Sequence, residues 1–456
     1  MNHSKIVVIG GDAAGMSTAS KIRRTHPEWE IVVFERGNHT SFAACGMPYY
    51  IAGDIPSPED LIARNPEVFR EKQNIDVRIL HEVVDIDPES KRVHVHDMGK
   101  DQKFWESYDQ LLIATGASPI RPDIEGIDAQ GVFSLSVLQT GIDVFKYIEQ
   151  NSPAKAIIVG GGYIGIEMAE ALLARGMHVT MIDMASQVMA NMDADMAEII
   201  ADYMSSKGVN LYLNEKLTRF ETDKGAVKGV HTENHTFDAD LVILGMGVKP
   251  NSEIAETAGI ETGVAGAIRV NGRLETSQPD IWAAGDCAES LHRITNKPTW
   301  IALGTVANKH GLVAGTNMSG GELHFPGVVG TAITKFQDLE IARTGLSEKE
   351  LKQESISYKH TLIQSRTRSG YYPENADIHV KLFADEATGR LLGGQIVGFE
   401  GSGKRIDTIA TAITAGFTAE DLMYTDLSYA PPFSPVWDPV QTAARRLSSM
   451  AGSLKS

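Results

Sequence analysis

The chain has 456 residues, with 42 lysines and arginines against 59 aspartates and glutamates, so its formal net charge is −17 at pH 7. At this length about three domains are expected, and so acidic a surface argues against nucleic-acid and membrane partners. No apolar run is long enough to span a bilayer, and no signal-peptide core follows the N-terminus. Two cysteines, Cys45 and Cys287, are too few for a disulfide framework. These features predict a cytoplasmic protein.

Two copies of one strand–turn–helix–strand unit organise the sequence. Each has an apolar strand, a glycine-rich turn, a helix and a second apolar strand ending in an acidic residue: residues 6–9, 10–15, 16–25 and 31–34 with Glu35, then residues 156–159, 160–165, a helix to about 175, and 179–182 with Asp183. Such a turn lets the backbone approach a pyrophosphate, the helix N-terminus faces the anion, and the acid binds a ribose. The repeat therefore predicts two dinucleotide-binding lobes.

The two turns differ in one important position. Asp12 stands where the fingerprint prefers glycine, and we predict that its side chain points away and caps the following helix. The alternative is that the ligand of this lobe sits differently. In the second unit the glycine pattern is complete, and the two residues after Asp183 carry no positive charge that could neutralise a 2′-phosphate. This predicts NADH in preference to NADPH.

The rest of the chain shows two further strand-to-turn segments and a change of pattern near the C-terminus. The segments are residues 111–116 and 281–286. From about residue 325 alternating strands such as 378–383 and 391–397 appear, followed by a helix over 405–415. This predicts a separate α+β domain, and the serine-rich residues from 447 onward are expected to fray.

Taken together, these motifs resemble the flavoprotein pyridine nucleotide-disulfide oxidoreductases over nearly the whole chain. Residues 10–15 with Glu35 resemble the site for the adenosine of FAD, and residues 281–286 resemble the second FAD motif, in which Asp286 would hold the ribityl and pyrophosphate groups. Residues 160–167 resemble the NAD(P)H loop. The resemblance implies that Tyr163 gates the flavin face and that Glu167 meets the nicotinamide.

The resemblance implies an α/β fold with two Rossmann-like dinucleotide-binding domains, for FAD and NAD, plus a C-terminal α+β dimerisation domain. The expected boundaries are 1–118 and 249–323 for the FAD-binding domain, 119–248 for the NAD(P)H-binding domain, 324–446 for the dimerisation domain and 447–456 for a tail. The implied cofactor-binding residues are Gly10, Ala13, Ala14, Gly15, Glu35, Arg36, Val83, Ala114, Thr115, Gly116, Gly160, Gly162, Tyr163, Ile164, Gly165, Glu167, Asp183, Gly245, Asp286 and Ala302. No metal site is expected.

Cys45 indicates the branch of the family. The two-cysteine branch carries its second redox cysteine five positions further on, where this chain has Tyr50. Residues 41–49 instead resemble the single-cysteine branch of coenzyme A-disulfide reductases, persulfide reductases, NADH oxidases and NADH peroxidases, whose cysteine lies beside the flavin. Cys287 matches no redox position, and we expect it to be a small buried side chain.

Three further positions distinguish the activities within this branch. Oxidases and peroxidases usually carry a histidine where this chain has Ala13, and the histidine supports sulfenate chemistry. Tyr371 and Tyr429 resemble the two tyrosines that, across a dimer, protonate a departing thiolate in the disulfide reductases. We therefore expect a homodimeric disulfide reductase. An NADH oxidase forming peroxide or water, and a non-enzymatic flavin redox sensor, remain the alternatives.

The resemblance leaves the small-molecule substrate open between coenzyme A disulfide and a related low-molecular-weight disulfide or persulfide. The implied substrate residues are Lys21, Arg24, Ser41 and Phe42. Two positions weaken a coenzyme A site, because Ala44 replaces a polar residue and Trp437 stands where coenzyme A reductases tend to have lysine. Coenzyme A binding is thus expected beside FAD and NADH, with these two positions against it.

Overall fold

The computed structural model describes residues 4–450, and its first sheet is built by the N-terminal unit of the sequence. This first lobe is a five-stranded parallel sheet in the order β18-β7-β1-β2-β3. Its strands are β1 (Lys5–Ile9), β2 (Glu30–Glu35), β3 (Asp76–Ile79), β7 (Gln110–Ile113) and β18 (Ile281–Ala283). Their apolar residues are almost entirely buried, as expected for a parallel sheet covered on both faces.

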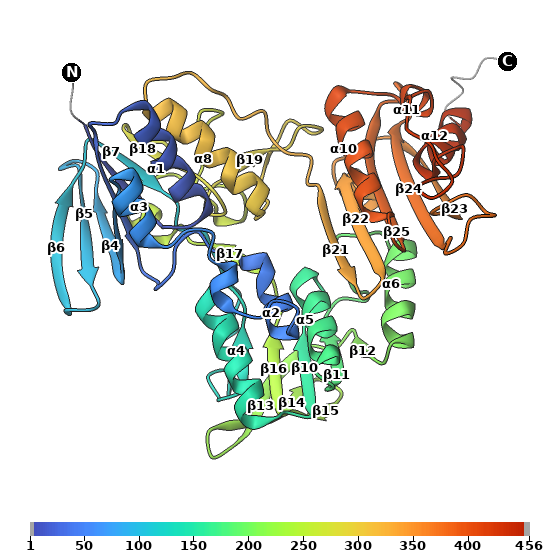
Figure 1. Cartoon of the computed structure of the whole chain (residues 1–456), viewed down its shortest axis with the longest axis horizontal. Coiled ribbons are helices and arrows are strands. Elements are labelled where there is room, and N and C mark those ends of the chain that lie inside the picture. Colours follow the sequence, from blue (N-terminus) through green and yellow to red (C-terminus); the bar gives the residue numbers. More distant parts are fainter. Residues whose placement is uncertain (1–3, 451–456) are drawn as a thin grey trace.

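Helices α1 (Ala13–Thr25) and α8 (Gly304–Met318) lie side by side on the first lobe (Figure 1). Gly311 allows this approach, since a Cβ atom there would lie 2.6 Å from the carbonyl oxygen of Ala14. The remaining elements of this lobe are β4 (His81–Asp87), β5 (Arg92–Asp97), β6 (Gln102–Ser107), α2 (Met47–Ala52), α3 (Pro66–Gln73), α7 (Glu253–Thr257), β19 (Ser290–Leu291) and β20 (Pro298–Thr299).

The second lobe repeats the parallel sheet, in the order β12-β11-β10-β16-β9. Its strands are β9 (Val132–Ser134), β10 (Lys155–Val159), β11 (His178–Asp183), β12 (Asn210–Leu213) and β16 (Leu241–Leu244), with helices α4 (Leu138–Asn151), α5 (Tyr163–Ala174) and α6 (Ala194–Ser206). A small antiparallel sheet, β13 (Leu217–Asp223), β14 (Ala226–Thr232) and β15 (Thr236–Asp238), belongs to it. The chain enters and leaves through the antiparallel pair β8 (Ala117–Pro119) and β17 (Val248–Pro250).

The C-terminal domain is an antiparallel sheet in the order β21-β22-β25-β24-β23 with helices against it. Its elements are β21 (Ala332–Phe336), β22 (Leu339–Gly345), α9 (Glu348–Gln353), β23 (Tyr358–Arg366), β24 (Asp377–Asp385), β25 (Leu391–Gly398), α10 (Ile406–Ala415), α11 (Ala419–Met423) and α12 (Pro439–Met450). The expectation of fraying from residue 447 is wrong for residues 447–450, because Leu447 is fully buried in the last turns of α12. Residues 451–456 of the expected tail lie outside the described residues.

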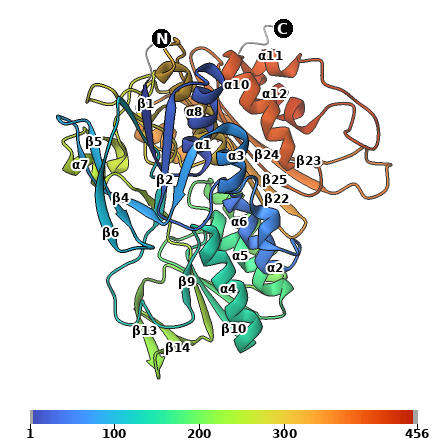
Figure 2. The same cartoon turned by 60° about the vertical axis from the view of Figure 1, so that its left-hand side comes forward.

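The C-terminal domain and the second lobe share one apolar core. Phe336 and Ile341 of the C-terminal domain belong to the same buried cluster as Ile200 and Met204 of α6. Helix α2 contributes Ile51 to this cluster and lies beside α4 and α5 (Figures 1 and 2). The segment that carries Cys45 is thus held against the second lobe, although it belongs in sequence to the first.

The predicted fold class is confirmed, with two Rossmann-like lobes and an α+β C-terminal domain. Across residues 4–450, no helix has the length and apolar character needed to cross a membrane.

Candidate active site

The two glycine-rich turns have nearly identical geometry. Gly10 has a φ of +107° and Gly160 a φ of +109°. A Cβ atom at Gly10 would lie 2.1 Å from the carbonyl oxygen of Ala114, and one at Gly160 would lie 2.3 Å from that of Gly245. Both turns therefore require glycine for the left-handed backbone and for the close approach of the neighbouring strand end.

The acidic residues at the ends of β2 and β11 hold these turns in place. Glu35 Oε2 accepts a hydrogen bond of 2.8 Å from the Gly11 amide, and Asp183 Oδ2 accepts one of 2.6 Å from the Gly161 amide. The second oxygen of each carboxylate accepts from the amide two residues further on, at 2.7 and 2.8 Å. Each carboxylate oxygen keeps a lone pair that a ribose hydroxyl can use.

Asp12 does not cap α1, so that expectation was wrong. It occupies the N-cap position, but its side chain makes no capping hydrogen bond. The carboxylate instead interacts with the backbone of Phe42 and of Ala13, and burial together with the charges of Glu35 and Asp286 raises its pKa to about 7. At the equivalent Gly162 a Cβ atom would have no neighbour within 4 Å. The first lobe thus carries a carboxyl group where the second leaves open space.

Asp286 offers an unsatisfied oxygen at the ligand edge of the first lobe. It lies three residues after the end of β18, burial raises its pKa to about 6, and its Oδ1 atom is buried without a hydrogen-bond partner among residues 4–450. A buried oxygen without a partner is costly unless a ligand supplies a donor. Together with the glycine turn, this oxygen fits the hydroxyl groups of a dinucleotide such as FAD.

Cys45 lies in a 3-10 turn directly before α2, with its side chain exposed. Desolvation raises the pKa of its thiol, and the carboxylates of Glu167, Asp286 and Asp12 raise it further. These charges act on Cys45 from both lobes, from Asp12 and Asp286 of the first and from Glu167 of the second. The charges of this chain alone favour the neutral thiol, whereas thiol chemistry requires the thiolate.

Tyr163 and Glu167 lie in the first turns of α5 and are held by residues that the sequence analysis did not identify. Asn191 donates a hydrogen bond of 3.3 Å from Nδ2 to the Tyr163 hydroxyl, and Thr334 of β21 donates one of 2.9 Å to Glu167 Oε1. Burial raises the pKa of both Tyr163 and Glu167. Neither Asn191 nor Thr334 belongs to a motif, so no sequence signal marked them.

Tyr371 and Tyr429 come together in the C-terminal domain. The interaction of its side chain with Tyr429 raises the pKa of Tyr371. The exposed fractions are 77% for Tyr371 and 45% for Tyr429, so both can reach another molecule. In Figure 1, α11 and α12, which flank Tyr429 in sequence, lie at the far right, whereas α2, next to Cys45, lies in the centre. Within one chain the tyrosines and Cys45 thus belong to separate parts of the molecule.

The predicted substrate residues lie on α1 and in the segment before Cys45. On α1, Lys21 is half-buried and Arg24 is exposed. Ser41 has a φ of +47°, and its amide donates to the Gly11 carbonyl oxygen at 3.1 Å, which ties the cysteine segment to the turn.

The predicted cofactor residues Arg36, Ala302 and Val83 differ in how accessible they are to a ligand. Arg36 is exposed just after β2, and Ala302 comes shortly before α8. The side chain of Val83 is buried in the core beneath β4, so only its backbone is available to a ligand. Cys287 is fully buried, as predicted, with its sulfur near the carbonyl oxygen of Ala284.

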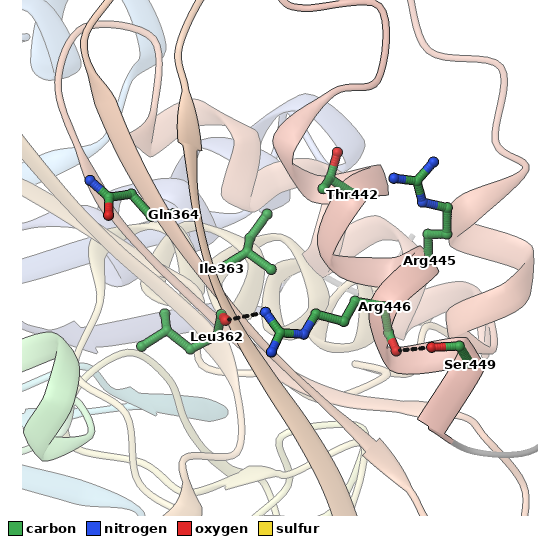
Figure 3. A pocket seen from close by; sticks show the side chains of 7 residues that line it. All are labelled: Leu362, Ile363, Gln364, Thr442, Arg445, Arg446 and Ser449. Carbon is green, nitrogen blue, oxygen red and sulfur yellow. Dashed lines mark hydrogen bonds between the residues drawn. The ribbon is translucent and has the colours of Figure 1, made fainter.

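A separate pocket of about 610 Å³ lies between β23 and α12 (Figure 3). Its lining residues are Leu362, Ile363, Gln364, Thr442, Arg445, Arg446 and Ser449. None of the predicted site residues lines it. Beside it, the Arg445 guanidinium lies 4.9 Å from the centre of the Trp437 ring. Arg445 therefore places a positive charge next to Trp437, the residue that stands where the resemblance leads us to expect a lysine in coenzyme A reductases.

The chain belongs to the pyridine nucleotide-disulphide oxidoreductase family. Residues 4–311 match the family model of that name, and residues 331–439 match the model of its dimerisation domain. The family implies FAD and a pyridine nucleotide as cofactors. The resemblance inferred from the sequence is thereby confirmed.

Similar proteins include both reductases and an oxidase. The chain is 43% identical to an NAD(P)H coenzyme A polysulfide/persulfide reductase of Pyrococcus horikoshii, covering 97% of this chain and 98% of the relative. It is 38% identical to an NADH oxidase of Methanocaldococcus jannaschii, covering 96% and 98%. The crystal structure of reduced CoADR-RHD from Bacillus anthracis superposes with a TM-score of 0.96 at 37% identity, covering 99% of this chain and 81% of that protein.

Proposed function

We propose that the protein is an FAD-dependent NAD(P)H:disulfide oxidoreductase that reduces coenzyme A disulfide or a related low-molecular-weight disulfide or persulfide through Cys45. The observation that carries this proposal is the convergence of a single accessible cysteine with Asp286 of the first lobe and Glu167 of the second. The persulfide reductase relative supports the choice of acceptor. FAD, when bound, supplies a carrier that takes a hydride from NAD(P)H and passes the electron pair to sulfur.

The residues of the first lobe would hold FAD. The turn at Gly10 admits the diphosphate, Glu35 receives the adenosine ribose, and Asp286 Oδ1 accepts a hydroxyl of the ribityl chain. In the second lobe, Asp183 receives the ribose of the nicotinamide dinucleotide and disfavours a 2′-phosphate, so NADH is the preferred coenzyme.

Cys45 performs the sulfur chemistry. Its thiolate attacks one sulfur of the disulfide, so that a Cys45–S bond forms, the substrate S–S bond breaks and one half leaves as a thiolate. Two electrons delivered by NAD(P)H then release the other half and restore Cys45. Because Tyr371 and Tyr429 are exposed in the C-terminal domain, we place them at the Cys45 of the partner subunit, where they protonate the departing thiolate. The enzyme is thus a homodimer with shared sites, in the cytoplasm, where thiols stay reduced.

Steady-state turnover with NADH tests this function directly. Coenzyme A disulfide, cystine, glutathione disulfide, a persulfide and molecular oxygen are offered in turn as acceptors. We expect turnover with at least one sulfur acceptor to exceed the oxygen rate at least 10-fold. In Cys45→Ser, FAD content and flavin bleaching by NADH should persist while disulfide reduction is lost. Parent-rate disulfide reduction in Cys45→Ser would overturn the sulfur relay.

An NADH oxidase is the second candidate, because one close relative bears that name. Ala13 argues against it, since this position offers no proton donor to a sulfenate. Oxygen consumption that matches NADH consumption and is unaffected by disulfides would favour the oxidase.

A further inference from the structure

A chain of polar contacts runs from the C-terminal domain to the hydroxyl of Tyr163. Arg343 of β22 donates a hydrogen bond of 2.7 Å from Nη1 to the backbone oxygen of Asn191. The side chain of Asn191 in turn donates from Nδ2 to Tyr163 Oη at 3.3 Å. The domain that forms the predicted dimer interface therefore reaches the second lobe's nucleotide turn through a single intermediate residue.

Arg343 is itself rigidly held. It is 7% exposed, and its Nη2 donates to Glu350 Oε2 at 2.7 Å and to the Gly345 oxygen at 2.8 Å. The Glu350 carboxylate also completes the capping box of α9 with Ser347. A buried guanidinium with its donors committed to several acceptors has little freedom to move. The backbone of Asn191 is accordingly fixed to the C-terminal domain.

The segment after Asn191 is clamped by a second group of contacts. Lys381 of β24, 2% exposed, places its Nζ 3.2 Å from Asp193 and 2.8 Å from Asp195. The Glu348 amide donates to Asp193 Oδ1 at 2.9 Å. These charged contacts fix the start of α6. They therefore also restrict the movement of Asn191, whose side chain contacts Tyr163.

Helix α5 receives independent support from β21. Thr334 contacts Glu167, as described above, and Lys335 Nζ lies 2.6 Å from Glu170 Oε1. The contact at Glu170 stabilises the same helix without reaching Tyr163. It therefore provides a matched comparison for the contact at Asn191.

We propose that Asn191 is a positioning residue for the Tyr163 gate, and that Arg343 of the C-terminal domain fixes Asn191 in that task. This inference rests on the proposed function in one respect, the role of Tyr163 as a gate that the nicotinamide must displace. Displacing the phenol breaks its hydrogen bond from Asn191, so this bond adds to the cost of nucleotide entry. The C-terminal domain thereby sets the affinity of the chain for its nucleotide.

The test measures nucleotide binding by FAD-loaded protein. NAD⁺ is titrated while the flavin absorbance is followed, and stopped-flow mixing with NADH gives the dissociation constant and the limiting rate of flavin bleaching. Asn191→Ala should lower the dissociation constants of NAD⁺ and of NADH roughly 2- to 10-fold, because displacement of the Tyr163 phenol no longer breaks a hydrogen bond. Lys335→Met, which removes the neighbouring contact on α5, should change them less than 2-fold.

A double-mutant cycle separates positioning from general damage. In a Tyr163→Phe background there is no hydroxyl to hold, so adding Asn191→Ala should have no further effect on nucleotide affinity. An unchanged or raised dissociation constant in Asn191→Ala overturns the proposal, as does an equal effect in the Tyr163→Phe background. Should Asn191→Ala fold poorly, Asn191→Ser gives the same readout, because its hydroxyl is too short to reach the phenol.

Failure of this inference is distinguishable from failure of the proposed function. Nucleotide binding and flavin bleaching precede any acceptor chemistry. A protein that reduces no disulfide but shows the expected cycle would lose the proposed function and keep the gate. If the protein reduces disulfides but Asn191→Ala leaves nucleotide affinity unchanged, the proposed function stands and the gate is refuted.

Discussion

Tyr371 and Tyr429 interact through their side chains, although they come from separate loops of the C-terminal domain, and this interaction raises the pKa of Tyr371. Tyr371 lies between β23 and β24, and Tyr429 between α11 and α12. In such a pair, one phenol can stabilise the phenolate that the other becomes when it gives up its proton. We therefore expect the pair to work as one acid rather than as two independent ones.

We expect Tyr371→Phe and Tyr429→Phe each to slow the disulfide half-reaction by ~10²-fold, the size of a general-acid contribution. Because the two act as a unit, the double variant should be little slower than the poorer single variant. Stopped-flow absorbance resolves the two half-reactions, and flavin bleaching by NADH should be unchanged. Fully multiplicative effects would mean that the tyrosines act separately.

Mixed dimers test whether each site belongs to two chains. Cys45→Ser is mixed with the Tyr371→Phe, Tyr429→Phe double variant, and the subunits are exchanged. If the tyrosines act across the interface, each heterodimer regains one complete site, and a 1:1 mixture recovers about a quarter of the parent activity. Unmixed homodimers of each of the two variants serve as the control. If the mixture is as inactive as each variant alone, Cys45 and the two tyrosines of one site belong to the same chain.

Asp183 should determine the choice of nicotinamide coenzyme. Its carboxylate accepts a hydrogen bond from the Gly161 amide, and we expect it to bind the ribose and to repel a 2′-phosphate. The parent protein should have a higher kcat/KM with NADH than with NADPH. Asp183→Asn keeps hydrogen-bonding groups but removes the charge, so it should lower the ratio of the two kcat/KM values roughly 10-fold. A parent protein that prefers NADPH would contradict this.

Arg445 should contribute to coenzyme A recognition by the neighbouring subunit. Its guanidinium lies over the Trp437 ring on an exposed face, where it can meet a phosphate. Arg445→Ala should raise KM for coenzyme A disulfide roughly 2- to 5-fold, the range of an exposed ion pair. KM for cystine, which carries no phosphate, should not change. Arg446→Ala is the matched control, because its guanidinium contacts the Leu362 carbonyl oxygen at 3.4 Å.

Asp12 should make the apoprotein less stable as the pH rises. Its folded pKa of about 7 lies above the ordinary value of 3.8, mainly because of burial, so the folded state holds a proton that the unfolded state has lost. The stability due to this proton is complete below pH 3.8 and is lost as the pH rises through 7. Relative to the parent, Asp12→Asn should therefore gain free energy of unfolding between pH 5 and 8 in urea titrations. A constant difference over that range would refute the prediction.

The same substitution bears on FAD. An ionised Asp12 beside a diphosphate repels it, so the rate of FAD release from the parent should increase as the pH passes 7, whereas Asp12→Asn should show a flatter profile. Fluorescence of the released flavin measures this rate. Asp12→Gly, which restores the glycine of the fingerprint, should resemble Asp12→Asn.

Local patterns made much of the fold predictable, and long-range pairings accounted for what was missed. The turns at Gly10 and Gly160 could be read because backbone sterics demand glycine there whatever surrounds them. The capping role expected for Asp12 was wrong because its carboxylate makes no capping hydrogen bond and interacts instead with the backbone of Ala13 and with that of Phe42, which no local rule places nearby. Asn191 was missed for a similar reason, since it lies 28 residues after Tyr163 in a segment that no local rule places beside the phenol.

The apolar core that α2 shares with α5 and β22 bears on how this architecture can change over evolution. Ile51, six residues after Cys45, is buried in the same cluster as Phe336 and Ile341. An exchange of the C-terminal domain between relatives would have to match this buried surface, or it would leave a void beneath the redox segment. The sulfur centre and the domain behind it are therefore constrained to evolve together.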